Sequence, residues 1–243
     1  LQNVTTFRNS VCNKYTNGRK QEMLRIFGPP GTGKTTTLLN MVDDALASGV
    51  HPHRIAFLAF TKKAATEAKE RAAQRFNLDP KKDLMFFRTL HSLALTMTDI
   101  RPEQVMQSEN YRELSRAIGI SLNEAKVVNY DNDLTDMVTN SDPLLGLINL
   151  TRLKKSDLRK EYNNSNIEED WNTVKYVDEC LREYKTKLGL YDFTDMLHEF
   201  VNQSAKYCPQ FDICFLDEAQ DLSALQWDIA HILDDNSDRM YAA

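Results

Sequence analysis

Residues 28–35 combine glycines with a lysine and a threonine at the spacing of a phosphate-binding loop. They read G-P-P-G-T-G-K-T, which fits the pattern G-x-x-x-x-G-K-[ST]. An apolar run at 23–27 precedes the loop and a helical pattern at 33–48 follows it, which is the strand–loop–helix context that the pattern requires. The predicted nucleotide-contacting residues are Gly28, Pro29, Pro30, Gly31, Thr32, Gly33, Lys34, Thr35 and Thr36.

The chemistry of this loop follows from its residue types. Glycines let successive backbone N–H groups turn toward phosphate oxygens, and the start of the following helix adds positive potential. Lys34 would reach the β- and γ-phosphates, and the hydroxyl of Thr35 would bind Mg²⁺. The loop therefore predicts ATP and Mg²⁺ as cofactors.

Acidic residues follow a second apolar run, at 213–216. If that run is a buried parallel strand, Asp217 at its carboxyl end would face the Mg²⁺ held by Thr35. Glu218 would then orient and deprotonate the water that attacks the γ-phosphate. Alone, an acidic turn that closes a strand is structural roughly two times in three. Together with the upstream loop, it favours a nucleotide hydrolase with Lys34 and Glu218 as catalytic residues.

The elements that must position these residues alternate between strand and helix. Strands are predicted at 23–27, 55–60, 84–87, 212–216 and 239–243. The helix after the second strand repeats Ala64, Ala68, Ala72 and Phe76 every four residues, which suits close packing on a sheet. This order predicts an α/β fold with a parallel sheet.

Residues 93–191 differ from the rest because their pattern is helical throughout. Helices are predicted at 109–118, 143–162 and 167–188, and a further helix lies at about 223–233. We therefore expect one domain formed by residues 1–92 and 192–243, with a helical insertion subdomain at 93–191. Trp171 and Trp227 occupy helical positions and are expected to be core anchors rather than stacking residues.

Composition and charge limit the class of protein. The chain has 243 residues, 42% hydrophobic content and a formal charge of −5, and no stretch approaches the ~20 apolar residues of a membrane helix. No secretory leader is evident, so we expect a cytoplasmic protein. Residues 1–92 carry 15 Lys and Arg against 7 Asp and Glu, whereas the remainder carries 15 against 28. A polyanion would be met mainly by the first part, although solvated faces would give the same asymmetry.

The four cysteines, Cys12, Cys180, Cys208 and Cys214, do not form a pattern typical of disulfides or of zinc. Cys214 lies in an apolar run and is expected to be a buried small hydrophobe.

Four segments together resemble the UvrD/Rep type of superfamily 1 DNA helicases. Residues 59–65 (A-F-T-K-K-A-A) are similar to the family's TFTNKAA motif, and residues 86–92 (F-F-R-T-L-H-S) to its GTFHS motif. Residues 217–221 (D-E-A-Q-D) resemble DExQD, and residues 191–196 (Y-D-F-T-D-M) resemble DFxDL. The order of the motifs and the long helical insertion also agree, so the resemblance implies a RecA-like domain carrying an insertion.

The resemblance also implies roles for residues outside the phosphate loop. Phe60, Thr61 and Lys62 would line a single-stranded DNA track, with Phe60 stacking on bases. Thr89 and His91 would touch phosphate or sugar. Without the resemblance, Phe60 is better explained as a core residue and His91 as a helix-start or core histidine.

Within the acidic motif and the segment before it, the resemblance separates chemistry from structure. Gln220 would couple the γ-phosphate to the rest of the motor, and Asp221 is expected to be structural. Asp192 fits a helix N-cap and is assigned no chemistry.

Three positions depart from the family pattern. The glutamine that usually precedes the phosphate loop is missing, with Arg8, Asn9 and Ser10 near its place. Thr36 replaces an arginine near the base, so the preference for ATP is open. Lys62 replaces an asparagine and keeps attraction for phosphate.

The resemblance implies an ATP-dependent DNA helicase or translocase that moves 3′ to 5′ on single strands. The family's later motifs would follow residue 243, so we expect a piece of a longer protein whose second RecA-like domain is a partner. Such a piece would hydrolyse ATP slowly on its own, because the family's transition-state arginines lie in those later motifs. Two alternatives remain: a helicase-like ATPase subunit of a nuclease or replication complex without unwinding activity, or a nucleotide-gated DNA-binding module.

Overall fold

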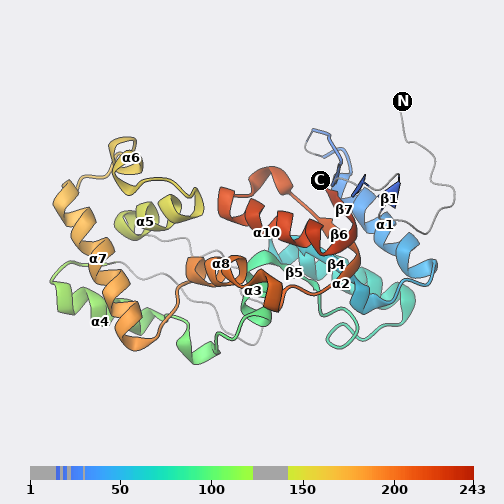
Figure 1. Ribbon diagram of the computed structural model, residues 1–243, viewed down its shortest axis with the longest axis horizontal. Coiled ribbons are helices and arrows are strands. Elements are labelled where there is room, and N and C mark those ends of the chain that lie inside the picture. Colours follow the sequence, from blue (N-terminus) through green and yellow to red (C-terminus); the bar gives the residue numbers. More distant parts are fainter. Residues whose placement is uncertain (1–14, 17–18, 21–22, 30, 123–141) are drawn as a thin grey trace.

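A five-stranded, all-parallel sheet forms the centre of the protein (Figure 1). The structure is a computed structural model that describes residues 15–16, 19–20, 23–29, 31–122 and 142–243. The strand order is β3–β7–β6–β4–β5, with consecutive strands of the chain separated by helical crossovers. The α/β class with a parallel sheet is therefore confirmed. The strands are β3 (Leu24–Arg25), β4 (Ile55–Ala59), β5 (Phe87–Thr89), β6 (Phe211–Leu216) and β7 (Ser237–Ala242).

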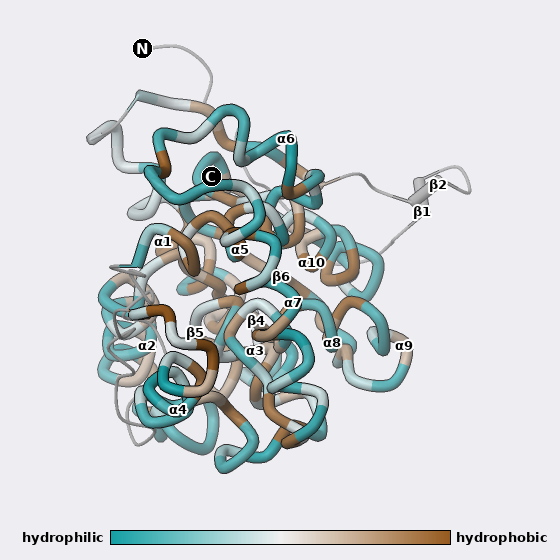
Figure 2. Tube along the Cα trace, turned by 90° about the vertical axis from the view of Figure 1, so that its left-hand side faces the viewer, coloured by the Kyte–Doolittle hydropathy of each residue, from teal (hydrophilic) through white to brown (hydrophobic). Residues whose placement is uncertain are grey.

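The two central strands are buried along their length because helices cover both faces of the sheet. All five residues of β4 are buried, and β6 is buried except for a half-buried Asp212. Leu58 of β4 lies opposite Leu216 of β6, so the two strands end at the same edge. Figure 2 shows the hydrophobic stretches around β4 and β5, while α9 (Ser204–Tyr207) is largely hydrophilic.

Helices α1 (Lys34–Ala47) and α2 (Lys62–Phe76) cover one face of the sheet. The buried face of α2 is formed by small side chains, which let the helix lie close to the strands. Ala68 and Ala72 belong to this face as predicted, but Ala65 and Ala73 complete it, whereas Phe76 is half-buried. Helices α3 (Leu90–Met97), α8 (Phe193–Asn202) and α10 (Ala224–Asp235) cover the other face.

The helical insertion has a hydrophobic cluster of its own. The cluster is formed by α4 (Ser108–Ile118), α5 (Pro143–Leu153) and α7 (Trp171–Leu188), with α6 (Leu158–Asn163) at its margin. The chain enters and leaves this unit where Val105 lies opposite Tyr191 in an isolated parallel bridge. Residue 92, the predicted boundary between the sheet domain and the insertion, lies inside α3. The division of the chain at residues 92 and 191 stays a prediction.

Several predicted boundaries were wrong for identifiable reasons. The third strand begins at Phe87 rather than Leu84, because Leu84 packs in the core before the strand pairs with β4. The predicted helix at 143–162 is two helices, interrupted by Lys155 with a φ of 54° and restarted by the N-cap Asp157. A two-stranded antiparallel sheet, β1 (Tyr15–Thr16) and β2 (Arg19–Lys20), was not predicted.

Cys214 and the two tryptophans pack in or against hydrophobic clusters, as the sequence predicted. Trp171 is half-buried against the insertion's cluster with the Arg159 guanidinium 4.6 Å from its ring centroid, and Trp227 packs against the sheet. Cys214 is buried, and burial raises the pKa of its thiol. Among the described residues, no helix has the length and apolar character needed to cross a membrane, and no group of three or more metal-binding side chains is present. Three short 3₁₀ helices lie at Pro52–Arg54, Pro102–Gln104 and Ala219–Asp221.

Candidate functional site

The phosphate loop connects β3 to α1, and its backbone requires glycine at three points. Gly31 and Gly33 have φ angles of +78° and +83°, a left-handed conformation that other residues rarely adopt. A Cβ on Gly28 would lie 2.5 Å from Oγ1 of Thr32, which donates a hydrogen bond to the carbonyl of Pro29 at 2.7 Å. The loop is thus held in a tight turn ahead of α1. Pro30 lies outside the described residues.

The two side chains at the start of α1 reach in different directions. Nζ of Lys34 donates to the carbonyl of Gly28 at 3.1 Å, so the amine lies over the loop. Oγ1 of Thr35 donates to Oδ1 of Asp217 at 3.1 Å, a contact between residues 182 positions apart. This contact joins the phosphate loop to the acidic motif, as the sequence predicted.

Asp217 directly follows the last residue of β6 and is 1% exposed. Its N–H donates to the carbonyl of Leu58 at 2.8 Å, which continues the ladder between β6 and β4 to the edge of the sheet. Burial raises the pKa of the Asp217 carboxyl, although the Thr35 hydroxyl partly offsets that effect by donating to it. The carboxylate accepts from this hydroxyl and, at 3.2 Å, from the backbone N–H of Glu218. Both donors are neutral, so the buried carboxylate lacks a full positive counterpart, which a cation would supply.

Glu218 has a left-handed backbone with a φ of 55°, which is uncommon for a residue other than glycine. The N–H of Ala219 donates to the carbonyl of Ala243 at 2.7 Å, and the N–H of Ala243 donates to the carbonyl of Leu216 at 2.9 Å. These bonds hold the turn in place between β6 and β7. Nothing in the residue types of the acidic motif indicated this strained turn.

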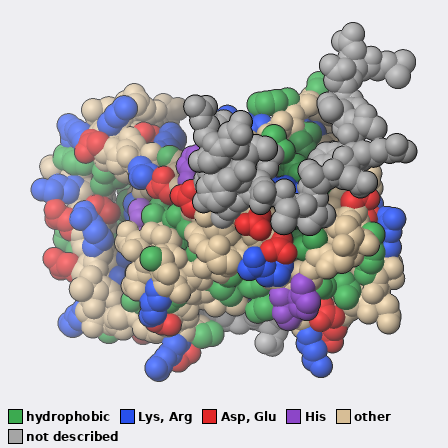
Figure 3. All heavy atoms as spheres, turned by 45° about the vertical axis from the view of Figure 1, so that its right-hand side comes forward, with side chains coloured by type: hydrophobic (Ala, Val, Ile, Leu, Met, Phe, Trp, Pro, Cys, Tyr) green, Lys and Arg blue, Asp and Glu red, His purple; other side chains and the backbone are tan. Residues whose placement is uncertain are grey.

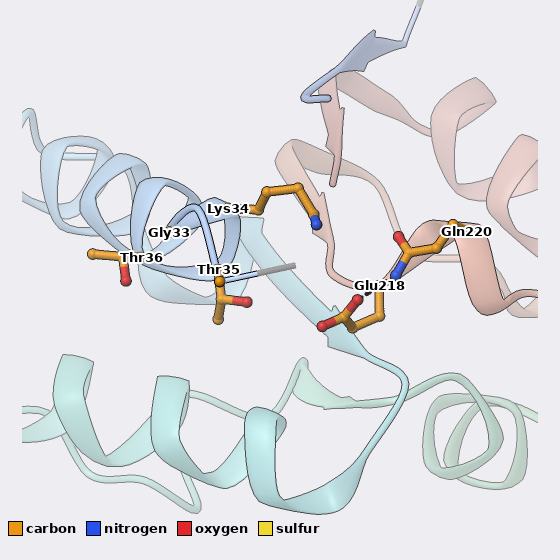
Figure 4. A pocket seen from close by; sticks show the side chains of 7 residues that line it. Gly33, Lys34, Thr35, Thr36, Glu218 and Gln220 are labelled. Atoms are coloured by element: carbon orange, nitrogen blue, oxygen red, sulfur yellow. Dashed lines mark hydrogen bonds between the residues drawn. The ribbon is translucent and has the colours of Figure 1, made fainter. Parts of the chain in front are cut away.

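Gln220 donates from Nε2 to Oε2 of Glu218, so the two candidate side chains contact each other directly. Figure 4 shows Lys34 and Thr35 pointing toward Glu218 and Gln220, while Thr36 points away from them. A hollow of about 370 Å³ lies between the phosphate loop and the acidic motif. It is lined by Gly31, Gly33, Lys34, Thr35, Thr36, Glu218 and Gln220.

The oxygen atoms of Thr35, which lines the hollow, and of Asp217, which Thr35 contacts, fit Mg²⁺ better than a softer metal. A threonine hydroxyl and a carboxylate are hard oxygen ligands, and Mg²⁺ usually takes one or two of these from the protein and the rest from phosphates and water. The structure therefore has the residues needed for a magnesium nucleotide.

The residues expected to contact DNA lie at the carboxyl ends of β4 and β5, beside this hollow. Ala59 lies opposite Thr89, so the segments that follow the two strands are neighbours. Phe60 is half-buried against the core cluster, which leaves part of its ring at the surface. Thr61 is exposed and caps α2 by accepting the N–H of Ala64 at 3.3 Å, and Lys62 is the first residue of that helix.

Thr89 and His91 are less available than the sequence suggested. Thr89 is 2% exposed, and its Oγ1 accepts the N–H of Ser92 at 3.3 Å as the N-cap of α3. We therefore leave its side chain out of the proposed DNA contacts. His91 is half-buried, and desolvation lowers the pKa of its imidazole to about 4. A neutral ring can still donate one hydrogen bond, but it adds no charge to attract phosphate.

Similarity to known proteins agrees with this geometry. The sequence model of the UvrD/REP helicase N-terminal domain matches residues 12–242. The chain belongs to the UvrD/Rep helicase family. A relative, the ATP-dependent DNA helicase PcrA of Leuconostoc citreum, is 27% identical over 245 residues, which cover 95% of this chain and 32% of the relative. The chain thus spans about a third of that relative's length. Family membership and the parallel sheet confirm the predicted RecA-like class.

Proposed function

We propose that the full-length protein is an ATP-dependent DNA helicase or translocase that moves 3′ to 5′ on single-stranded DNA, and that this chain is the N-terminal part of its motor. The observation that carries the proposal is the 3.1 Å contact between Thr35 and Asp217. It brings the phosphate loop and the acidic motif of a UvrD/Rep-family domain to one hollow at the carboxyl edge of the sheet. Ligands bind at this edge in doubly wound folds.

The proposed chemistry assigns a separate task to each side chain of the hollow. The backbone of the loop and Lys34 would bind the phosphates of ATP, and Thr35 and Asp217 would hold Mg²⁺, which neutralises charge on the β- and γ-phosphates. Glu218 would orient the attacking water and accept its proton. Gln220 would sense the γ-phosphate through its contact with Glu218.

DNA would lie across the carboxyl ends of β4 and β5, next to the nucleotide. Phe60 would offer its exposed ring edge to bases, and Thr61 and Lys62 would face the backbone at the start of α2. A second RecA-like domain of the full-length protein would close the nucleotide site from the other side. The greater length of the PcrA relative supports this part of the proposal.

The test is the substitution Glu218→Gln in a longer form of the protein that hydrolyses ATP. Loss of the proposed base should lower kcat by about 10²- to 10⁴-fold, because proton transfer to a positioned side chain contributes that much. ATP affinity should change little, since the amide keeps the size of the carboxylate. Asp221→Asn, one turn away and outside the hollow, is the matched control. Unchanged hydrolysis by the Glu218 variant would remove the base assignment.

A further inference from the structure

Four charged side chains meet where the helical insertion joins the sheet domain. Arg152 comes from the last turn of α5 and Lys185 from the last turn of α7, while Asp192 is the N-cap of α8 and Asp195 lies in its first turn. Arg152 contacts Asp192 at 2.6 Å and also pairs with Asp195. Nζ of Lys185 lies 2.5 Å from Asp192 and 2.6 Å from Asp195. Each cation therefore contacts both carboxylates.

This four-residue cluster is balanced in charge and largely withdrawn from water. The side chains of Lys185 and Asp192 are 8% and 3% exposed. Burial alone would raise the pKa of Asp192, but Arg152 and Lys185 outweigh it and hold that pKa below its usual range. Asp192 and Asp195 also accept each other's backbone N–H at 2.8 Å, which fixes both carboxylates to the start of α8.

Further contacts connect α5 to the helices that pack beside the proposed DNA edge and after the acidic motif. Thr194 of α8 donates to Asn149 of α5 at 3.3 Å, and Lys155 after α5 pairs with Asp228 of α10 at 2.6 Å. Helix α8 packs against α3, which starts at the proposed DNA edge, and α10 follows the acidic motif. In Figure 1, α5 lies between α7 of the insertion and α8 and α10 of the sheet domain.

The fully buried residues on the two sides form separate clusters. The apolar contacts between the two sides lie at the margins: Leu153 of α5 is partly buried against the cluster of the sheet domain, and a small cluster of Ile100, Val105 and Met196 lies where the chain enters and leaves the insertion. Apolar packing of this kind does not by itself select one relative orientation. Apolar contacts are non-directional. A cluster of directed ion pairs from three helices has a single satisfied arrangement. Buried ion pairs add little net stability compared with apolar residues of similar size, but they can select one geometry.

We propose that the cluster of Arg152, Lys185, Asp192 and Asp195 is the joint that sets the orientation of the helical insertion on the sheet domain. Arg152 and Lys185 are positioning residues, since neither lies in the nucleotide hollow. Their effect on DNA-dependent turnover rests on the proposed function. Their effect on the orientation of the insertion is independent of the proposed function.

The orientation is tested on the full 243-residue chain with spin labels at Gln74 of α2 and Glu179 of α7, both exposed. Native cysteines other than the buried Cys214 are replaced by serine. The test variant combines Arg152→Met, Lys185→Met, Asp192→Asn and Asp195→Asn, which removes all four charges while asparagine keeps the helix cap. The matched control is Lys154→Met, which breaks a pair with Glu161 inside the insertion.

The distance distribution should broaden by about twofold in the test variant and stay unchanged in the control, because several orientations become populated. Thermal unfolding should remain cooperative. A folded test variant with an unaltered distribution would overturn the proposal. Loss of cooperative unfolding would also overturn it, because the cluster would then be needed for folding rather than for orientation.

A second measurement asks whether orientation matters for the motor. In a longer form of the protein, Lys185→Met should raise the KM for single-stranded DNA in the ATPase assay by about fivefold or more, whereas Lys185→Arg should restore it. ATP hydrolysis without DNA should stay the same. If the spin-label result holds but DNA has no effect on any form, the proposed function fails and the joint stands. If DNA stimulates every variant equally, the positioning role of Lys185 fails.

Discussion

The carboxyl ends of β3 and β6 and those of β4 and β5 lie at one edge of the sheet, but they use their polar side chains differently. At the first pair of ends, Thr35 bonds to Asp217 and Gln220 bonds to Glu218, so the side chains contact each other around a hollow. At the second pair, Thr61 and Thr89 cap helices. The nucleotide edge is therefore built from side chains that contact each other, whereas at the proposed DNA edge the threonines cap helices and the surface keeps Thr61 and part of the Phe60 ring.

The distribution of charge only partly matches the division between the nucleotide edge and the proposed DNA edge. The first 92 residues are basic on balance, yet three of their arginines, Arg54, Arg71 and Arg75, form ion pairs within the fold. Asp43, 3% exposed, takes Arg71 at 2.7 Å and also Arg75, which ties α1 to α2 on the side away from the edge. On the face in Figure 3, lysines and arginines are interspersed with acidic side chains. The basic excess is thus not simply a DNA-binding surface.

We expect the largest effect at the nucleotide edge, in the phosphate loop. Lys34→Ala should weaken binding of a fluorescent ATP analogue by about 10²-fold or more, because it removes a charge-assisted contact to phosphate. The fold should be unaffected, since the Nζ atom bonds only to the Gly28 carbonyl of an exposed loop. Undiminished binding in an equilibrium titration would contradict the assignment. Lys63→Ala, outside the hollow, is the control.

At the DNA edge, Phe60→Ala should weaken binding of a single-stranded oligonucleotide by roughly 5- to 100-fold, because stacking of a base on an aromatic ring contributes ~1–3 kcal/mol. Fluorescence anisotropy at several salt concentrations measures the affinity and its salt slope. The slope should stay the same, since no cation is lost. If both affinity and slope are unchanged, Phe60 is only a core residue.

The caps Thr61 and Thr89 distinguish a residue that only stabilises a helix from one that also contacts DNA. Thr89→Ala and Thr61→Ala should each lower the free energy of unfolding by about 1 kcal/mol, as loss of a threonine cap usually does. Only the exposed Thr61 should also weaken DNA binding. Denaturant titrations and anisotropy on the same samples separate the two effects. Weaker DNA binding by a stable Thr89 variant would show that the buried cap reaches DNA after all.

The last expected effect is confined to acidic pH and comes from His91. Its folded pKa of about 4 lies below the unfolded value, so the unfolded state binds the proton first as pH falls. Stability should decline between about pH 6.5 and pH 4 by at most about 3 kcal/mol and level off below that. His91→Gln should remove this part of the pH dependence, and NMR titration should find the ring neutral at pH 5. A ring that titrates near pH 6.5 would contradict it.

Sequence reasoning succeeded where local pattern and geometry are linked. The residue types of the phosphate loop and of the apolar run before Asp217 each predict the local structure. In a parallel sheet, the loop after β3 and the acidic residues after β6 then lie at the same edge. It did less well where a residue's role depends on neighbours remote in sequence. Asp192 was predicted as a cap, which is confirmed, but its pairing with Arg152 and Lys185 depends on how three helices meet.

Burial explains the other differences. Thr89 and His91 match a DNA motif by residue type. The alternative of a helix-start or core histidine was open for His91, but nothing indicated that Thr89 would be buried at the start of α3. The left-handed backbone of Glu218 could not be predicted from the sequence either, because it depends on hydrogen bonds between the turn after β6 and Ala243. Motifs thus predicted which segments meet, and the structure decides which atoms are available.

The central claim is that Thr35 and Asp217 hold the magnesium ion of a bound nucleotide, and Asp217→Asn tests it most directly. Binding of a fluorescent ATP analogue to the 243-residue chain is measured with Mg²⁺ and with EDTA, for both the unaltered chain and the variant. The asparagine keeps an oxygen for the Thr35 hydroxyl but removes the charge that favours the cation. We predict that Mg²⁺ tightens binding about tenfold or more in the unaltered chain and has little effect in the variant. An equal gain from Mg²⁺ in both proteins would contradict the account.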